Sequence, residues 1–183
     1  TGSGGTGKTR LSLQVAATVM DSFPDGVWFL ELAPVTDPAL VPQTLANLLE
    51  LRESAETKQT ISELVCGYLR VRKALLVFDN CEHLIEACAR FADLLLRSCK
   101  DVKILASSRE ALGVSGEMAW HVPSLSLPDL KHLPSVEQLS EYEAARLFIE
   151  RATLVQPRFA VTRENASAIA QICFRLDGIP LAL

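Results

Sequence analysis

Apolar residues are arranged along this chain in two ways, as short continuous runs and as stripes at helical spacing. The runs at 27–32, 74–79 and 102–107 are rich in β-forming residues and predict strands, and a further short strand is expected at 118–122. The run at 74–79 is apolar up to its last residue, Asp79, which is typical of a parallel strand buried on both faces. Helical stripes separate these runs, so the pattern predicts an α/β fold with a parallel sheet.

Four helices are predicted in this region from apolar residues spaced three and four apart. The first follows residue 9, and its buried face is expected to carry Leu11, Val15 and Val19. The second follows Asp37 and should start late or kink, because Pro42 conflicts with an uninterrupted first two turns. A capping box at Thr60–Glu63 opens the third, and the fourth places apolar residues between 84 and 99 on one side.

Strand signals stop in the last third of the chain. A stretch rich in proline, serine and leucine at 123–134 is typical of a linker. We therefore predict two domains, a core over 1–133 and a small helical lid over 134–183.

Two helices are predicted in the lid. Ser140–Glu143 fits a capping box, and the helix that it opens should turn inward Ala145, Phe148, Ala152 and Val155. Thr162 is expected to start the second helix, and Asp177–Gly178 can stop it in a left-handed conformation.

Composition excludes some functions. Of 183 residues, 49% are apolar and 22% charged, and the net charge of -4 with scattered Lys and Arg argues against direct nucleic-acid binding by this segment. No apolar run is long enough to span a membrane. The five cysteines are an odd number without metal-ligand spacing, so we expect free thiols and a cytoplasmic protein.

The chain begins with a phosphate-binding motif. Its glycines allow a backbone that turns successive N–H groups inward around an anion, Lys8 is placed to reach the β- and γ-phosphates, and the Thr9 hydroxyl to ligate Mg²⁺. A flexible glycine linker is the alternative, but a linker does not need Lys-Thr followed by an amphipathic helix. The residues predicted to bind ATP or ADP here are Gly2, Gly4, Gly5, Thr6, Gly7, Lys8, Thr9 and Arg10.

Two strand ends carry further candidates. Asp79 would emerge at the carboxyl edge of the sheet and hold Mg²⁺ through water, although it could instead cap the next helix. Ser107–Arg109 lies where a γ-phosphate sensor would be placed. Ser108 could equally cap a helix, and Arg109 could be a solvated surface residue. The residues alone leave both alternatives open.

Four motifs in this order make the chain resemble the nucleotide-binding domain of the STAND signal-transduction ATPases. They are the phosphate loop, Leu76–Asn80, Ser107–Arg109 and Gly178–Leu181. The resemblance covers nearly the whole chain. It is closest to the bacterial branch found in LuxR-type and SARP/AfsR-type transcriptional regulators, on the basis of Asp79–His83 and Ser108–Gly113.

The resemblance implies a P-loop NTPase sheet of order 5-1-4-3-2, in which the strand before Ser107 lies between the phosphate-loop strand and the Asp79 strand. It also implies that Arg109 senses the γ-phosphate in cis and that Pro180 of the lid lies against the adenine. The strand that precedes the loop in such proteins is absent from this chain. Without it, we expect the chain to associate or to bind ATP poorly.

One position departs from the resemblance. Many relatives follow the Mg²⁺-coordinating aspartate with a second acid, whereas this chain has Asn80, an amide that cannot act as a general base. Hydrolysis should therefore be slow unless Glu82 or Glu31 substitutes. We predict an ATP/ADP regulatory switch with Mg²⁺ as cofactor. Its expected partners are effector domains outside this segment, either DNA-binding or repeat domains, and other copies of itself through nucleotide-dependent self-association. The alternatives are a conventional P-loop kinase or motor and a non-hydrolysing nucleotide clamp.

Overall fold

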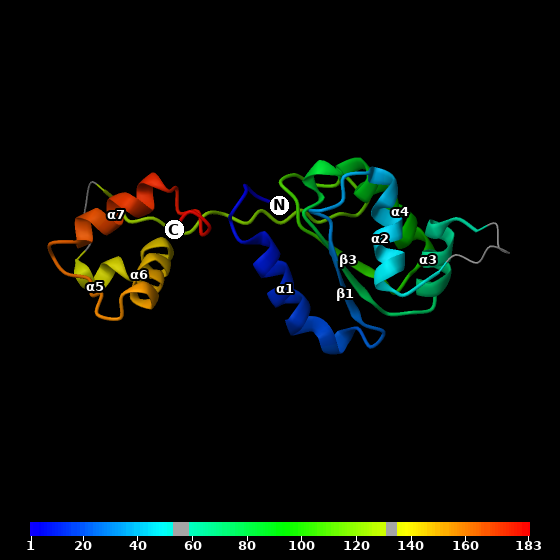
Figure 1. Cartoon of the computed structure of the whole chain (residues 1–183), viewed down its shortest axis with the longest axis horizontal. Helices are drawn as coiled ribbons and strands as arrows, with labels where there is room; N and C mark the ends of the chain where they lie inside the picture. Colours follow the sequence, from blue (N-terminus) through cyan, green and yellow to red (C-terminus); the bar gives the residue numbers. More distant parts are fainter. Residues whose placement is uncertain (53–58, 131–134) are drawn as a thin grey trace. The chain divides into compact units, whose positions relative to one another are not determined.

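The computed structural model describes residues 1–52, 59–130 and 135–183. They form two compact units, the first made of residues 1–2 and 8–121 and the second of residues 3–7 and 122–183 (Figure 1). The predicted domain boundary after residue 133 lies outside the described residues and stays a prediction.

A three-stranded parallel sheet is the centre of the first unit. Its strands β1 (Val27–Glu31), β2 (Leu75–Asp79) and β3 (Lys103–Ala106) pair in the order β1-β2-β3. All five residues of the central strand β2 are buried, as its apolar run predicted. The structure confirms these three strands and an α/β fold, and it places the Asp79 strand between the other two.

Helices cover both faces of this sheet (Figure 1). Alternate residues of a strand point to opposite faces, so Leu76 and Phe78 pack into a core with α2, α3 and α4, whereas Leu75 and Val77 pack against α1. The helical segments of this unit, with η for a 3-10 helix, are α1 (Lys8–Val19), η1 (Met20–Ser22), η2 (Pro38–Leu40), α2 (Val41–Leu48), α3 (Ile61–Leu69), η3 (Cys81–His83) and α4 (Ile85–Ser98).

Local start signals were predicted correctly for α2 and α3. The Asp37 side chain accepts a hydrogen bond from the Ala39 amide at 2.9 Å, and α2 begins only after η2. At α3, the Thr60 amide donates to Glu63 Oε2 at 2.8 Å and the Glu63 amide donates to Thr60 Oγ1 at 3.3 Å. These bonds to the Thr60 backbone and side chain hold the pKa of Glu63 below its usual value.

The buried face of α1 differs from the prediction. Ser12 and Ala16 are its buried residues, whereas Leu11 and Val15 are 43% and 41% exposed. Small side chains let the helix approach β2 closely, and Ala16 packs there with Leu75 and Val77. Leu11 and Val15, one position back along the helix, point away from that contact. Of the predicted stripe, Val19 does pack against this cluster.

The strand expected at 118–122 is wrong, because the structure has no regular element there. Met118 and Trp120 are largely exposed, and the Trp120 carbonyl instead accepts a hydrogen bond from the Thr1 amino group at 2.6 Å. No strand of the described residues pairs with this stretch, and an isolated extended segment gains no ladder hydrogen bonds.

The second unit is helical and has its own core. Its helices are α5 (Val136–Leu139), α6 (Glu143–Val155) and α7 (Ala166–Arg175). Its buried residues are Leu139, Ala144, Ala145, Ile169, Ala170 and Cys173. The expected linker also belongs here, because Leu125, Leu127 and Leu130 pack on this core and the Leu125 amide donates to the Gly178 carbonyl at 2.9 Å.

The start of α6 was predicted wrongly. Ser140 Oγ donates to the Glu137 carbonyl and caps no helix, whereas Ser135 and Gln138 form the capping box, at α5. At α6, the Glu143 amide donates to Ser126 Oγ at 2.9 Å and the Ser126 amide donates to the Glu143 carboxylate at 3.1 Å. The partner is thus 17 residues distant in sequence.

Two other helix ends of this unit can be compared with the prediction. Val155, expected inward, is 88% exposed, and Phe159 takes its place by packing edge-on against Phe148. Asp177 and Gly178 both have positive φ after α7, as predicted. No helix within the described residues is long and apolar enough to cross a bilayer.

Candidate functional site

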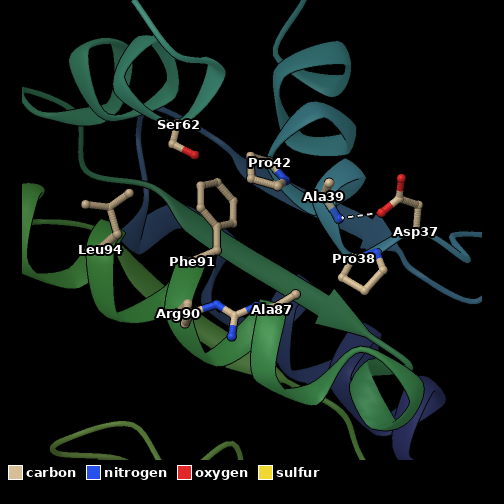
Figure 2. Close-up of a pocket in the computed structure, with 9 residues that line it drawn as sticks. All are labelled: Asp37, Pro38, Ala39, Pro42, Ser62, Ala87, Arg90, Phe91 and Leu94. Carbon is tan, nitrogen blue, oxygen red and sulfur yellow. Dashed lines mark hydrogen bonds between the residues drawn. The ribbon is translucent and has the colours of Figure 1, made fainter.

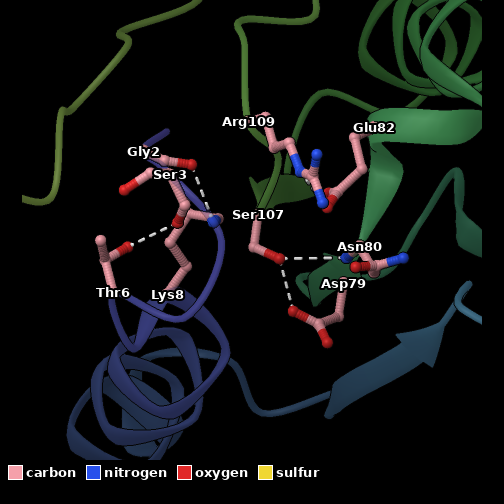
Figure 3. Close-up of polar contacts among 9 residues, drawn as sticks. All are labelled: Gly2, Ser3, Thr6, Lys8, Asp79, Asn80, Glu82, Ser107 and Arg109. Atoms are coloured by element: carbon pink, nitrogen blue, oxygen red, sulfur yellow. Dashed lines mark hydrogen bonds and ion pairs between the residues drawn. The ribbon is translucent and has the colours of Figure 1, made fainter. Parts of the chain in front are cut away.

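Two hydroxyl groups hold the carboxylate at the end of β2. Thr9 Oγ1, in the first turn of α1, lies 2.8 Å from Asp79 Oδ1 and 3.0 Å from Oδ2. Ser107, which follows β3, donates its hydroxyl to Asp79 Oδ1 (Figure 3). The Asp79 carboxylate caps no helix, because η3 and α4 begin without a side-chain cap. The alternative that Asp79 caps the next helix is therefore wrong.

Backbone hydrogen bonds tie the ends of β2 and β3 together. The Asn80 amide donates to Ser107 Oγ at 3.0 Å (Figure 3). The Cys81 amide donates to the Ser107 carbonyl at 3.0 Å, and the Ser107 amide donates to the Phe78 carbonyl at 2.8 Å. Ser107 thus contacts the strand end, the turn after it and Asp79 at once. The sequence indicated Ser107 only as part of the Ser107–Arg109 motif. Its position at the end of a predicted strand was the feature that could have identified it as a contact of Asp79.

Arg109 forms an ion pair across this edge. Its Nε lies 3.3 Å from Glu82 Oε1 on η3, and the two side chains are 67% and 20% exposed (Figure 3). Within the described residues, Glu82 Oε2 and Ser108 Oγ are buried without a hydrogen-bond partner. No helix begins at Ser108, so its alternative role as a cap is wrong. Arg109 is exposed, yet it is also paired.

Lys8 closes back over the start of the glycine loop. Its ammonium donates to the Gly2 carbonyl at 2.9 Å (Figure 3). Arg10, the next predicted nucleotide contact, is exposed on α1. Glu31, one of the acids that could replace the missing base, is also exposed, and the strand register pairs it with Asp79.

Residues 3–7 of the loop pack within the second unit. Thr6 Oγ1 donates to the Ser3 carbonyl at 3.0 Å, and the Leu181 amide donates to the Gly5 carbonyl at 3.2 Å. Gly5 has φ +80°, and a β-carbon there would lie 2.9 Å from Leu181 Cβ and 3.0 Å from Ile179 Cγ2. Only glycine therefore fits this position on both counts.

The other predicted nucleotide-binding residues of this unit are less constrained by their surroundings than Gly5. Gly7 is also left-handed, with φ +90°, but has open space around it, and Gly4 is exposed. Pro180 is half-buried in the turn after α7, between the two residues that contact Gly5. The geometry leaves the predicted adenine contact of Pro180 untested.

The oxygen atoms of Thr9 and Asp79 fit a hard divalent cation. Mg²⁺ takes oxygen ligands, keeps several waters and needs only one or two protein groups besides phosphate oxygens. Thr9 and Asp79 supply a hydroxyl and a carboxylate that already lie in contact. No group of three or more His, Cys, Asp or Glu that could hold a metal by itself occurs in the described ranges. A cation here would thus depend on ligands from outside the protein.

Buried thiols lie behind this edge. Cys81 and Cys88 are both buried, and the hydrogen bond between their side chains, together with burial, raises the pKa of Cys81. All five cysteines are buried and free. They therefore pack as small apolar groups.

A separate groove of about 510 Å³ lies in the first unit (Figure 2). Its lining is mainly apolar and comes from η2 with its cap residue, from the start of α2, from α3 and from α4. None of the predicted nucleotide or metal residues lines it. The residues around it are Asp37, Pro38, Ala39, Pro42, Ser62, Ala87, Arg90, Phe91 and Leu94.

Comparison with known proteins finds similar chains in mycobacteria, while no protein-family model matches. A protein of Mycobacterium tuberculosis (strain ATCC 25618 / H37Rv) named "Putative HTH-type transcriptional regulator Rv0890c" is 41% identical over 182 residues, which are 100% of this chain and 19% of that protein. A second protein of the same strain, "Uncharacterized protein Rv0894", is 39% identical over 183 residues, which are 100% of this chain and 43% of that protein. The chain thus spans less than half the length of either relative.

Proposed function

We propose that this chain is an ATP- and ADP-binding switch domain of a transcriptional regulator, with Mg²⁺ as its cofactor and slow ATP hydrolysis. The observation that carries the proposal is the contact of Thr9 with Asp79. The threonine lies in the first turn of the helix that follows a glycine-rich loop, and the aspartate ends a buried parallel strand. A phosphate-binding loop uses these two groups to hold the cation that bridges the phosphates.

The charge distribution supports a phosphate ligand at this place. Lys8 and the N-terminus of α1 both contribute positive charge beside the glycine loop, and α1 is 12 residues long. Lys8 donates to a backbone carbonyl, a contact that an anionic phosphate can replace with a stronger, charge-assisted one. The cation would then compensate the charge of Asp79, which is buried.

The regulatory part of the proposal rests on the relatives. One of them is named as a transcriptional regulator, and the chain corresponds to about a fifth of it. Domains in the rest of such a protein would carry DNA binding, and the segment described here would report the nucleotide state to them. Slow turnover suits this role, because Asn80 cannot act as a base and the ATP state then persists.

Isothermal titration with Mg·ATP and Mg·ADP tests the proposal. Lys8→Ala should weaken both affinities by about ten- to a hundredfold, since it removes a charged hydrogen-bond donor. Lys100→Ala is the matched control, because this lysine is exposed and its ammonium lies 4.0 Å from Asp101. If the wild-type chain binds neither nucleotide, or if Lys8→Ala binds both as tightly as Lys100→Ala does, the proposal is wrong.

A further inference from the structure

Glu82 has an environment that its role as a substitute base does not explain. Its side chain is only 20% exposed and one carboxylate oxygen, Oε2, is buried without a hydrogen-bond partner among the described residues. A buried, unpaired carboxylate oxygen is costly. Within the described part of the chain, the carboxylate pairs with Arg109 through its other oxygen, Oε1.

The backbone keeps the two partners next to each other. Glu82 is the second residue of η3, which begins directly after the left-handed residue Asn80, and the Cys81 amide donates to the Ser107 carbonyl. Arg109 follows Ser107 by two residues. Because Ser107 joins the two strand ends, Glu82 and Arg109 are presented by one cross-linked segment.

The atoms used in the ion pair are informative. Glu82 binds Arg109 through Nε, at 3.3 Å, and the guanidinium has four further N–H donors on Nη1 and Nη2. These terminal nitrogens form the fork that binds a phosphate in bidentate fashion. The carboxylate therefore holds the side of the guanidinium and leaves its end available.

We infer that Glu82 is a positioning residue for Arg109, which it orders so that Nη1 and Nη2 meet the terminal phosphate of ATP. The inference rests on the proposed function, since it requires that Arg109 recognise the γ-phosphate. Arg109 is 67% exposed and would otherwise be free to adopt many rotamers. Ordering one such side chain in advance accounts for about a two- to tenfold gain in affinity, and only for the nucleotide that Arg109 contacts.

The test compares ATP and ADP affinities of Glu82 variants by calorimetric titration at fixed Mg²⁺. Glu82→Asp keeps the charge but is one methylene shorter, so it should weaken ATP binding about two- to tenfold and leave ADP binding unchanged. Glu82→Gln keeps an acceptor oxygen of the same reach and should lie closer to the wild type. Arg109→Ala should weaken ATP binding at least as much as Glu82→Asp, and Glu82→Asp should add nothing to it.

Glu86→Asp is the matched control. Glu86 forms a similar pair with Arg90 at 3.4 Å on α4, with both side chains exposed, and its substitution should change neither affinity. A purely structural role of Glu82 would lower ATP and ADP affinity equally, and a role as competitor of the phosphate would raise ATP affinity. Either result overturns the inference, as does a Glu82→Asp effect that persists in Arg109→Ala.

A second substitution decides the matter if Glu82→Asp does not fold. Arg109→Lys keeps the charge but has neither the Nε that Glu82 holds nor the fork, so it should discriminate ATP from ADP less well than the wild type and better than Arg109→Ala. Discrimination equal to that of the wild type would overturn the inference. If the wild-type chain binds no nucleotide at all, the proposed function fails, whereas normal binding with silent Glu82 variants removes the positioning role alone.

Discussion

Substitution of Gly5 by alanine is the sharpest test of how the glycine loop packs. Gly5 has φ +80°, and its carbonyl accepts the hydrogen bond from the Leu181 amide. A new β-carbon would lie 2.9 Å from Leu181 Cβ and 3.0 Å from Ile179 Cγ2, distances at which one of the two segments must move. Leu181 Cβ is fixed by its backbone and cannot move by side-chain rotation, so the move involves backbone.

Gly7 supplies a control with the same backbone problem and no steric one. Its φ is +90°, and a β-carbon there has no neighbour within 4 Å. Gly7→Ala should therefore cost only the left-handed strain, about 1–2 kcal/mol. Gly5→Ala adds the cost of an overpacked contact, about 1–3 kcal/mol, for a total of about 2–5 kcal/mol.

Hydrogen exchange at the Leu181 amide is the assay, because this N–H reports the contact directly. Measured without nucleotide, its protection should be lost in Gly5→Ala and retained in Gly7→Ala, and urea unfolding should show the larger loss of stability in the first variant. Equal protection of Leu181 in both variants would refute the reasoning, since the segment from Ile179 to Leu181 would then not pack against Gly5.

Substitutions at three further positions test the site and one helix cap. Asp79→Asn should leave metal-free nucleotide binding nearly intact and reduce the gain from Mg²⁺, and equal losses with and without the ion would exclude a metal role. Asn80→Asp should raise the single-turnover rate of ATP cleavage whereas Asn80→Gly should not, and equal rates would point to another limiting step. Folding lowers the pKa of Glu63 below its ordinary value of 4.5. Its ionised carboxylate therefore stabilises the folded chain above pH 4.5, and this contribution is lost as the pH falls through the lowered pKa of the folded state. The unfolding free energies of wild type and Glu63→Gln should therefore differ at neutral pH and converge in acid, and a constant difference would contradict the capping role.

Local signals in the sequence were sufficient where the structure uses local contacts. The apolar run before Asp79 became the buried central strand, and Thr60 and Glu63 bond to each other within one turn. The late start of α2 followed from proline chemistry at Pro42 alone. These elements require nothing from distant parts of the chain.

The failures occur where a distant segment decides the outcome. Ser140 had the right local spacing to cap α6, but Ser126 makes that contact from 17 residues away. On α1, hydrophobicity favoured Leu11 and Val15, whereas close packing against β2 selected the small residue Ala16. The spacing of apolar residues does not show which face of a helix will contact the sheet. That choice also depends on how closely the helix packs against the sheet.

Asn80 shows how a chemical and a conformational explanation can apply to one residue. Asn80 has φ 65° and ψ 51°, a left-handed conformation that asparagine and aspartate tolerate better than other side chains with a β-carbon. Its backbone N–H donates to Ser107 Oγ at 3.0 Å, so the turn holds Asn80 against the end of β3. The sequence alone suggested only a missing base. The structure adds that a residue at position 80 must adopt this left-handed turn. Asparagine and aspartate can both do so, and the geometry therefore does not require asparagine in place of an acid. Asparagine fits the turn and supplies no general base, which is what the proposed slow switch requires.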